Sequence, residues 1–174
     1  RENRYRAGLT LLVGAAVGLV SFFAPRLLGP GDGLIEEALQ NPLEASRAAL
    51  VLVARFALTL ASYATGAAGG LFAPLLVLGA EAGVLVGRAA EQLGPFSHAA
   101  LPVYAVVGMG ALFAGSVRAP LTGVLLMIEM TGALSALLPL AYAVILADLT
   151  ARALGSRPIY EALLERDMAR KGAD

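Results

Sequence analysis

One segment of this sequence could bind an ion without any charged side chain. Gly69-Gly70-Leu71-Phe72-Ala73-Pro74 lies within residues 56–80, a stretch that contains no charged residue. Glycine and proline cannot continue an ideal helix here, so one helix must end before the segment and another begin at it. The first amides of a helix have no intrahelical acceptor and carry the positive end of the helix dipole, which favours an anion. The segment therefore predicts an anion site made of backbone amides.

Each residue type in the segment has a physical reason to be there. Gly69 and Gly70 let the backbone approach an ion closely. The amides of Leu71 and Phe72 can point at the ion while their apolar side chains exclude water. Pro74 suits the first turn of a helix, because its missing N–H would be unpaired there. A glycine-rich contact between packed helices accounts for the same residues equally well.

Other residues that could do chemistry are few. The chain has no cysteine and one histidine, His98, so we expect no metal site and no serine–histidine hydrolase. The run from Gly29 to Asp32 fits the G-x-G-D pattern of intramembrane aspartyl proteases, with Asp148 as a second carboxylate. Such an enzyme needs two facing aspartates, whereas Asp32 follows a proline in a turn. We expect neither enzyme activity nor a cofactor.

The composition indicates lipid as the solvent. Hydrophobic residues make up 58% of the chain, the mean hydropathy is +0.75 and only 15% of residues are charged, whereas about a quarter are charged in soluble domains. The 13 basic and 13 acidic residues balance, so no basic surface is expected to attract nucleic acid. The lipid bilayer is the expected surroundings.

The uncharged stretches predict an all-α integral membrane protein whose helices are interrupted by glycine and proline. Residues 7–24 are long enough to cross a hydrocarbon core of about 30 Å. The expected helices cover residues 7–24, 34–39, 43–63, 75–93, 99–117, 121–130, 134–154 and 159–173. Because the chain begins at Arg1 rather than at a methionine, we expect it to be a fragment.

Three segments resemble the CLC family of chloride channels and proton/chloride antiporters. Gly70-Leu71-Phe72-Ala73-Pro74 is similar to the family's G-x-F-x-P anion-site motif. The stretch from Gly108 to Thr131, including Arg118-Ala119-Pro120-Leu121-Thr122-Gly123, and the segment Pro158-Ile159-Tyr160 also match, in the family's order. The resemblance implies a bundle of tilted and discontinuous transmembrane helices, one half of an inverted-repeat subunit.

The resemblance also implies a site and a function. The amides of Leu71 and Phe72 and the hydroxyl of Tyr160 would bind chloride, with Gly69, Gly70, Ala73 and Pro74 as the scaffold of the motif. A phenol is a neutral hydrogen-bond donor, although an interfacial anchor is the other interpretation of Tyr160. The implied function is transmembrane transport of chloride, or of nitrate as an alternative anion. A different secondary transporter with a broken-helix site and a transport-incompetent partner are the alternatives.

The same resemblance assigns the parts of the chain. Residues 1–157 would be the C-terminal part of the transmembrane domain, and residues 158–174 an amphipathic helix on the cytoplasmic side that carries Tyr160. The N-terminal half of the subunit would hold the gating and proton-transfer glutamates, so channel and antiporter are not distinguished. Residues 121–130 and 134–154 would form a homodimer interface. The expected location is the inner membrane of a prokaryote, with both basic ends in the cytoplasm.

Three charged residues within apolar stretches need an explanation. Glu129 is expected to be structural, with Thr131 beside it as a helix cap or hydrogen-bond partner, although an intramembrane carboxylate is a functional candidate. Glu81 and Arg88 lie seven residues apart on one helix face, and for Glu81 we expect packing or pairing with Arg88 ahead of a role in proton handling. Arg118 would either raise the local anion concentration or extend from a helix end to the membrane surface.

Overall fold

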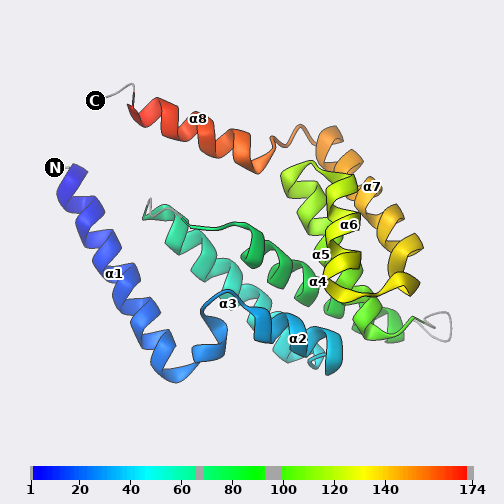
Figure 1. Ribbon diagram of the computed structural model, residues 1–174. Helices are drawn as coiled ribbons and strands as arrows, with labels where there is room; N and C mark the ends of the chain where they lie inside the picture. Colours follow the sequence, from blue (N-terminus) through cyan, green and yellow to red (C-terminus); the bar gives the residue numbers. More distant parts are fainter. Residues whose placement is uncertain (1, 66–68, 93–98, 172–174) are drawn as a thin grey trace.

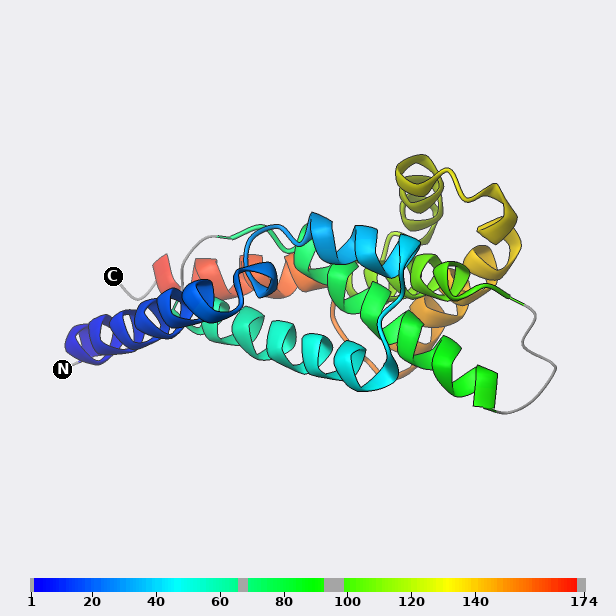
Figure 2. The same ribbon diagram turned by 90° about the horizontal axis from the view of Figure 1, so that it is seen from below.

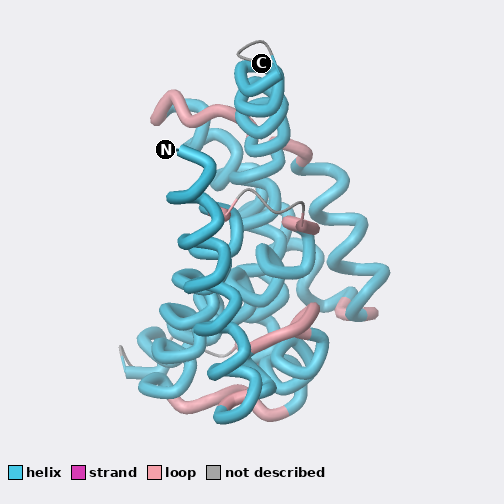
Figure 3. Tube along the Cα trace, turned by 90° about the vertical axis from the view of Figure 1, so that its left-hand side faces the viewer, coloured by secondary structure: helices cyan, strands magenta, loops and turns pink. Residues whose placement is uncertain are grey.

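A computed structural model describes residues 2–65, 69–92 and 99–171, and every regular element in these ranges is helical (Figure 3). The predicted all-α class is therefore confirmed. His98 lies outside the described residues. The elements in chain order are α1 (Glu2–Phe23), the 3-10 turn η1 (Pro25–Leu27), α2 (Asp32–Gln40), α3 (Ala45–Ala64), α4 (Phe72–Gln92), α5 (Leu101–Val117), α6 (Pro120–Thr131), η2 (Leu134–Ala136), α7 (Leu137–Ala153) and α8 (Ile159–Lys171).

Four helices begin earlier than the sequence predicted, namely α1, α2, α4 and α6. Helix α4 starts at Phe72 rather than at residue 75, because Pro74 is compatible with the whole first turn and not only with its first position. Helix α2 starts at Asp32, directly after Gly31 in a left-handed conformation (φ 89°). Because α4 starts at Phe72, the motif residues themselves form the N-terminal end of the helix.

Helix α5 lies at the centre of the bundle and packs against α2, α4, α6 and α7. Helix α3 covers α4 from the other side, whereas α1 contacts α3 and η1 only lightly. Figures 1 and 2 show both termini at one end of the molecule and helices α6 and α7 at the opposite end. Both ends of the chain can therefore lie on one side of a membrane.

Three glycines let α4 and α5 approach each other to backbone contact. A Cβ atom at Gly79 would lie 2.6 Å from Cα of Met109. A Cβ atom at Gly83 or Gly108 would overlap a carbonyl oxygen of the facing helix, that of Tyr104 or of Gly79. In lipid, small residues drive helix association because apolar side chains gain nothing by leaving the hydrocarbon for another helix. This contact fixes the position of α4 relative to α5.

The outer surface is apolar. Large hydrophobic side chains such as Leu12, Phe22, Leu121, Leu138 and Tyr142 are mostly exposed. Among the described residues, three helical segments are long and apolar enough to cross a membrane: Ala45–Ala64, Phe72–Gln92 and Leu134–Ala153. Such a surface is compatible with a bilayer and not with water.

The α4–α5 contact predicts different effects for one substitution at two positions of α5. In the full-length protein, Gly108→Ala should destabilise the fold by about 1–3 kcal/mol, because the added methyl group collides with backbone atoms. Gly115→Ala is the matched control, since the nearest atom to its Cβ would be 3.6 Å away. The unfolding temperature of each purified variant in detergent measures the difference. Equal unfolding temperatures would contradict the proposed contact.

Candidate anion site

The start of α4 presents backbone amides that the helix does not use. The first intrahelical hydrogen bond of the motif runs from the amide of Leu75 to the carbonyl of Leu71, at 3.1 Å. Pro74 has no amide hydrogen, so the amides of Leu71, Phe72 and Ala73 precede the bonded part of the helix. The amides at this end also lie at the positive end of the helix dipole.

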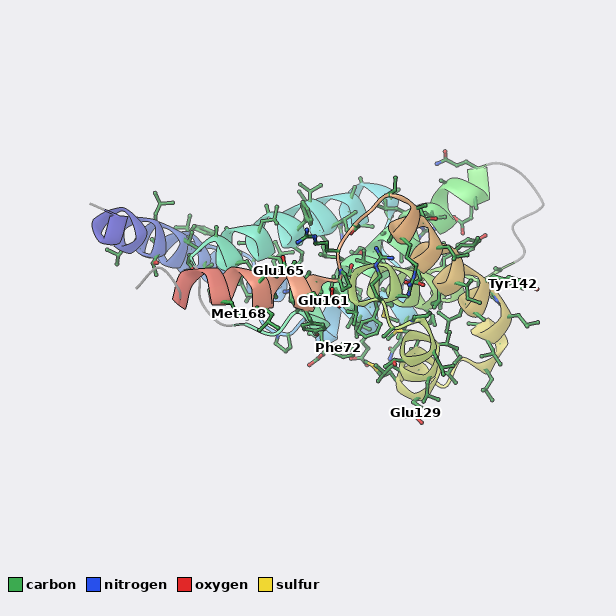
Figure 4. The ribbon with its side chains drawn as sticks, turned by 90° about the horizontal axis from the view of Figure 1, so that it is seen from above. Phe72, Glu129, Tyr142, Glu161, Glu165 and Met168 are labelled. Carbon is green, nitrogen blue, oxygen red and sulfur yellow. The ribbon has the colours of Figure 1, made fainter. Side chains whose placement is uncertain are left out.

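An aromatic contact holds this helix start against α5. The ring of Phe72 packs edge-to-face on the ring of Phe113, with centroids 5.8 Å apart. Phe113 is buried, and Gly123 of α6 leaves room for its ring. Figure 4 shows Phe72 near the middle of the molecule. The motif is therefore held by α5 as well as by its own helix, and α6 packs against the ring of Phe113.

Tyr63 is a site residue that the sequence reasoning missed. It lies at the end of α3, and its hydroxyl donates a hydrogen bond of 3.0 Å to the carbonyl of Gly69. Tyr63 and Tyr160 of α8 lie close enough for an electrostatic interaction between their phenol groups. The end of α3 and the start of α4 therefore meet here, and the start of α8 lies within electrostatic reach. A tyrosine six residues before the first motif glycine was the available signal in the sequence.

Arg118 positions the segment that leads into α8. It ends α5 in a left-handed conformation (φ 67°), an uncommon backbone for a residue with a side chain. Its Nη1 donates to the carbonyl of Asp148 (2.8 Å), and its Nη2 donates to the carbonyl of Ser156. Nη1 also lies 3.5 Å from the Asp148 carboxylate, and both side chains are less than a tenth exposed. Arg118 thus joins α5, α7 and the segment before Tyr160.

The position of Asp148 argues against the protease alternative. Its carboxylate faces Arg118 and also accepts a hydrogen bond of 2.8 Å from Arg152. Asp32 begins α2, which packs against α4 and α5. The carboxylate of Asp148 is therefore committed to arginines and does not face a second aspartate.

A comparison with protein families identifies the chain. The model of the family described as voltage gated chloride channel matches residues 1–152. The chain belongs to this family. The sequence motifs had indicated this family of integral membrane proteins, so the predicted resemblance is confirmed. Tyr160 lies beyond the residues that the family model matches.

Two relatives in this family cover most of the chain. The H(+)/Cl(-) exchange transporter ClcA of Klebsiella pneumoniae is 39% identical over 163 residues, which are 94% of this chain and 34% of the relative. The crystal structure of a slow cyanobacterial Cl⁻/H⁺ antiporter matches with a TM-score of 0.85 and 41% identity, over 92% of this chain and 38% of that one. The chain thus spans little more than a third of the length of these relatives.

Glu81 and Arg88 do not have the partners that the sequence predicted. The expected pair between Glu81 and Arg88 is wrong: Arg88 donates to the carbonyls of Pro42 and Leu43 and pairs with Glu91 at 3.3 Å. Seven residues separate Glu81 and Arg88 by about 10 Å along a helix. Glu81 is only 1% exposed, and its Oε2 has no hydrogen-bond partner among the described residues.

Glu129 lies outside the site. Its side chain is exposed on α6 and points away from the helices (Figure 4). The hydroxyl of Thr131 donates to the carbonyl of Met127 (2.6 Å) and accepts from the amide of Ala133. Thr131 therefore completes the end of α6 through backbone hydrogen bonds rather than through Glu129.

Asp148 pairs with one buried arginine, Arg118, and one exposed arginine, Arg152. Removing the shared carboxylate should therefore destabilise the protein more than removing the exposed arginine. In the full-length protein, Asp148→Asn should clearly lower the unfolding temperature, because it leaves the charge of Arg118 uncompensated. Arg152→Gln is the control: that side chain is 61% exposed, and losing an exposed partner should lower the unfolding temperature much less. Thermal unfolding of both variants in detergent provides the measurement. A larger effect at Arg152 would refute the ranking.

Proposed function

We propose that the protein containing this chain transports chloride across a membrane. The observation that carries this proposal is the start of α4, where the amides of Leu71 and Phe72 lie ahead of the first hydrogen bond of the helix. The hydroxyl of Tyr160 is the third proposed ligand; the electrostatic effect of this residue on Tyr63, which is bonded to Gly69, supports its inclusion. Chloride would bind between α4 and α8.

The chemistry of these ligands suits transport. An ion must bind strongly enough to lose its hydration shell and weakly enough to be released. Backbone amides and a phenol are neutral donors, so they compensate the charge of the anion without forming an ion pair. Gly69, Gly70 and Ala73 carry little or no side chain that could obstruct the ion, and Pro74 leaves the first turn without a competing donor.

Proton coupling is part of the proposal. The relative from Klebsiella pneumoniae is named an exchanger of H⁺ and Cl⁻, and the solved cyanobacterial relative is an antiporter of the same two ions. We propose the same exchange for the protein containing this chain, with nitrate as an alternative anion. The proposed setting is the inner membrane of a prokaryote, where the N-terminal half of the subunit completes the pathway.

The proposed protein is a homodimer that associates through α6 and α7. Leu121 and Leu125 on α6 and Leu138 and Tyr142 on α7 are mostly exposed. These two helices lie next to each other at one end of the bundle (Figure 1). A second copy of the subunit would cover these side chains.

The anion site predicts a specific loss of chloride affinity. In the full-length protein reconstituted into liposomes, Tyr160→Phe and Phe72→Ala should both alter chloride efflux. Removing the phenol hydroxyl should raise the half-saturating chloride concentration by roughly two- to tenfold, the equivalent of one hydrogen bond. Tyr104→Phe is the matched control, because this tyrosine packs at Gly87, at the opposite end of α4 from the motif. Equal effects at Tyr160 and Tyr104 would remove Tyr160 from the site.

Proton coupling is tested separately in the same liposomes. A chloride gradient should drive protons against their own gradient in a fixed ratio, because exchange links the two movements. The pH inside the vesicles reports proton movement, and a chloride electrode reports efflux. Passive chloride flux without proton movement would make the protein a channel. No chloride flux from folded wild-type protein would reject the transport function itself.

A further inference from the structure

One carboxyl group is buried near the middle of a helix that can cross the membrane. Glu81 lies on α4, one of the segments long and apolar enough to span a bilayer, and is only 1% exposed. Its Oε2 atom has no hydrogen-bond partner among the described residues. An ionisable side chain at membrane depth carries a large free-energy cost and commonly marks a functional residue. Glu81 is therefore a candidate for a function rather than for packing alone.

Glu81 lies on the face of α4 that packs along α2. One turn before it, a methyl group of Val77 lies where a Cβ atom of Gly31 would be, directly before α2. Two turns after it, Arg88 donates to the carbonyl of Pro42, in the segment that follows α2. Residues 77, 81 and 88 follow the spacing i, i+4 and i+11, which places them on one side of a helix. The carboxyl group of Glu81 therefore faces α2 between the two ends of that helix.

The nearest charge on α2 has the same sign as Glu81. Glu37 is the group whose electrostatic effect reaches the carboxyl group of Glu81. The other acidic residues of α2, Asp32 and Glu36, are exposed. Two neighbouring carboxylates repel each other, so a proton bound to one of them relieves the repulsion. Glu37 is only half-buried, and burial disfavours the charged form, so the proton belongs on Glu81.

The other helices that pack on α4 supply no positive partner. Arg55 of α3 is buried, but it donates to a backbone carbonyl at 3.0 Å, and no salt bridge joins it to Glu81 in the described part of the chain. Helix α5 contains no charged residue, and Tyr104 is its only titratable one. On α4 itself, Arg88 pairs with Glu91 at 3.3 Å. A charged Glu81 would therefore be buried without a compensating cation.

We propose that Glu81 is a proton-binding residue, which takes up a proton at Oε2 to become a neutral acid and releases it during exchange. A proton needs a single oxygen atom, whereas a metal ion needs several ligands. Release returns the proton to water on the side of Glu37, which lines a cavity of about 260 Å³ at the start of α2. The inference rests on the proposed proton exchange. It adds a proton-binding residue about 13 Å along α4 from Phe72.

Proton movement in liposomes tests this role on the full-length protein. Glu81→Gln keeps the size and the neutral charge of the protonated acid but cannot release a proton. It should therefore lose the uphill proton movement that a chloride gradient drives, while chloride efflux continues. Glu81→Asp retains a titratable group and should retain both movements. Glu91→Gln is the matched control, because this carboxylate is on the same helix and its side chain is 46% exposed.

The wild-type measurement separates this proposal from the function on which it rests. Coupled proton movement in the wild type and its loss in Glu81→Gln support the proposal. Equal coupling in both proteins overturns the role of Glu81 and leaves the proposed exchange standing. Chloride flux without proton movement in the wild type contradicts the exchange, and the role of Glu81 is rejected with it.

Infrared spectroscopy measures the bound proton without transport. The difference spectrum between wild type and Glu81→Gln should contain the carbonyl stretch of a protonated carboxylic acid in mildly acidic buffer, and this band should disappear in alkaline buffer. The Glu91→Gln difference should show only an ionised carboxylate, because Glu91 is partly exposed and paired with Arg88. An ionised Glu81 in both buffers would overturn the proposal. So would a crystal structure of the full-length wild type in which an arginine pairs with Glu81.

Discussion

Backbone hydrogen bonding in lipid is the constraint that shapes this chain. A bilayer offers no water to an unpaired amide or carbonyl, so an interruption of a helix at that depth must be compensated by protein or by an ion. Within the described residues, two interruptions combine glycine, alanine and proline, one before α4 and one between α5 and α6. Protein groups compensate the interruption between α5 and α6, whereas the interruption before α4 leaves amides for an ion and is the candidate anion site.

The two interruptions share glycine, alanine and proline but not their consequences. Between α5 and α6, the amide of Arg118 bonds to the carbonyl of Ala114 at 2.9 Å, and the side chain of Arg118 holds carbonyls of α7 and of the following segment. That interruption is closed by protein. Before α4, by contrast, the amides of Leu71 and Phe72 precede the bonded ladder, and the only described side chain bonded to the motif backbone is Tyr63, which donates to a carbonyl. The amides remain for a ligand.

Buried charges follow a similar division. Asp148 faces Arg118 and Arg152, and Arg88 is held by the carbonyls of Pro42 and Leu43. These contacts fix α7 to α5 and α4 to the segment before α3. Arg55 and Glu81 are buried as well, but neither forms an ion pair within the described residues. Glu37 of α2 is the charged group whose electrostatic effect reaches Glu81, and it has the same sign. Arg55 of α3 and Glu81 of α4 are therefore buried ionisable groups without an ion pair among the described residues.

The sequence alone determined the helical class, the interruption at Gly69–Pro74 and the family, because these depend on composition, on local backbone preference and on motif order along the chain. It did not determine which side chains meet. Tyr63 and Gly69 lie close in sequence, yet their contact depends on where α3 ends. Arg118 and Asp148 lie far apart in sequence and are brought together by the packing of α5 on α7. The Glu81–Arg88 pair failed because a shared helix face does not bring side chains two turns apart into contact, while carbonyls of a neighbouring segment were nearer to Arg88. Contacts across helices were decided by the glycine-mediated approach of α4 and α5, a distance that no local pattern encodes.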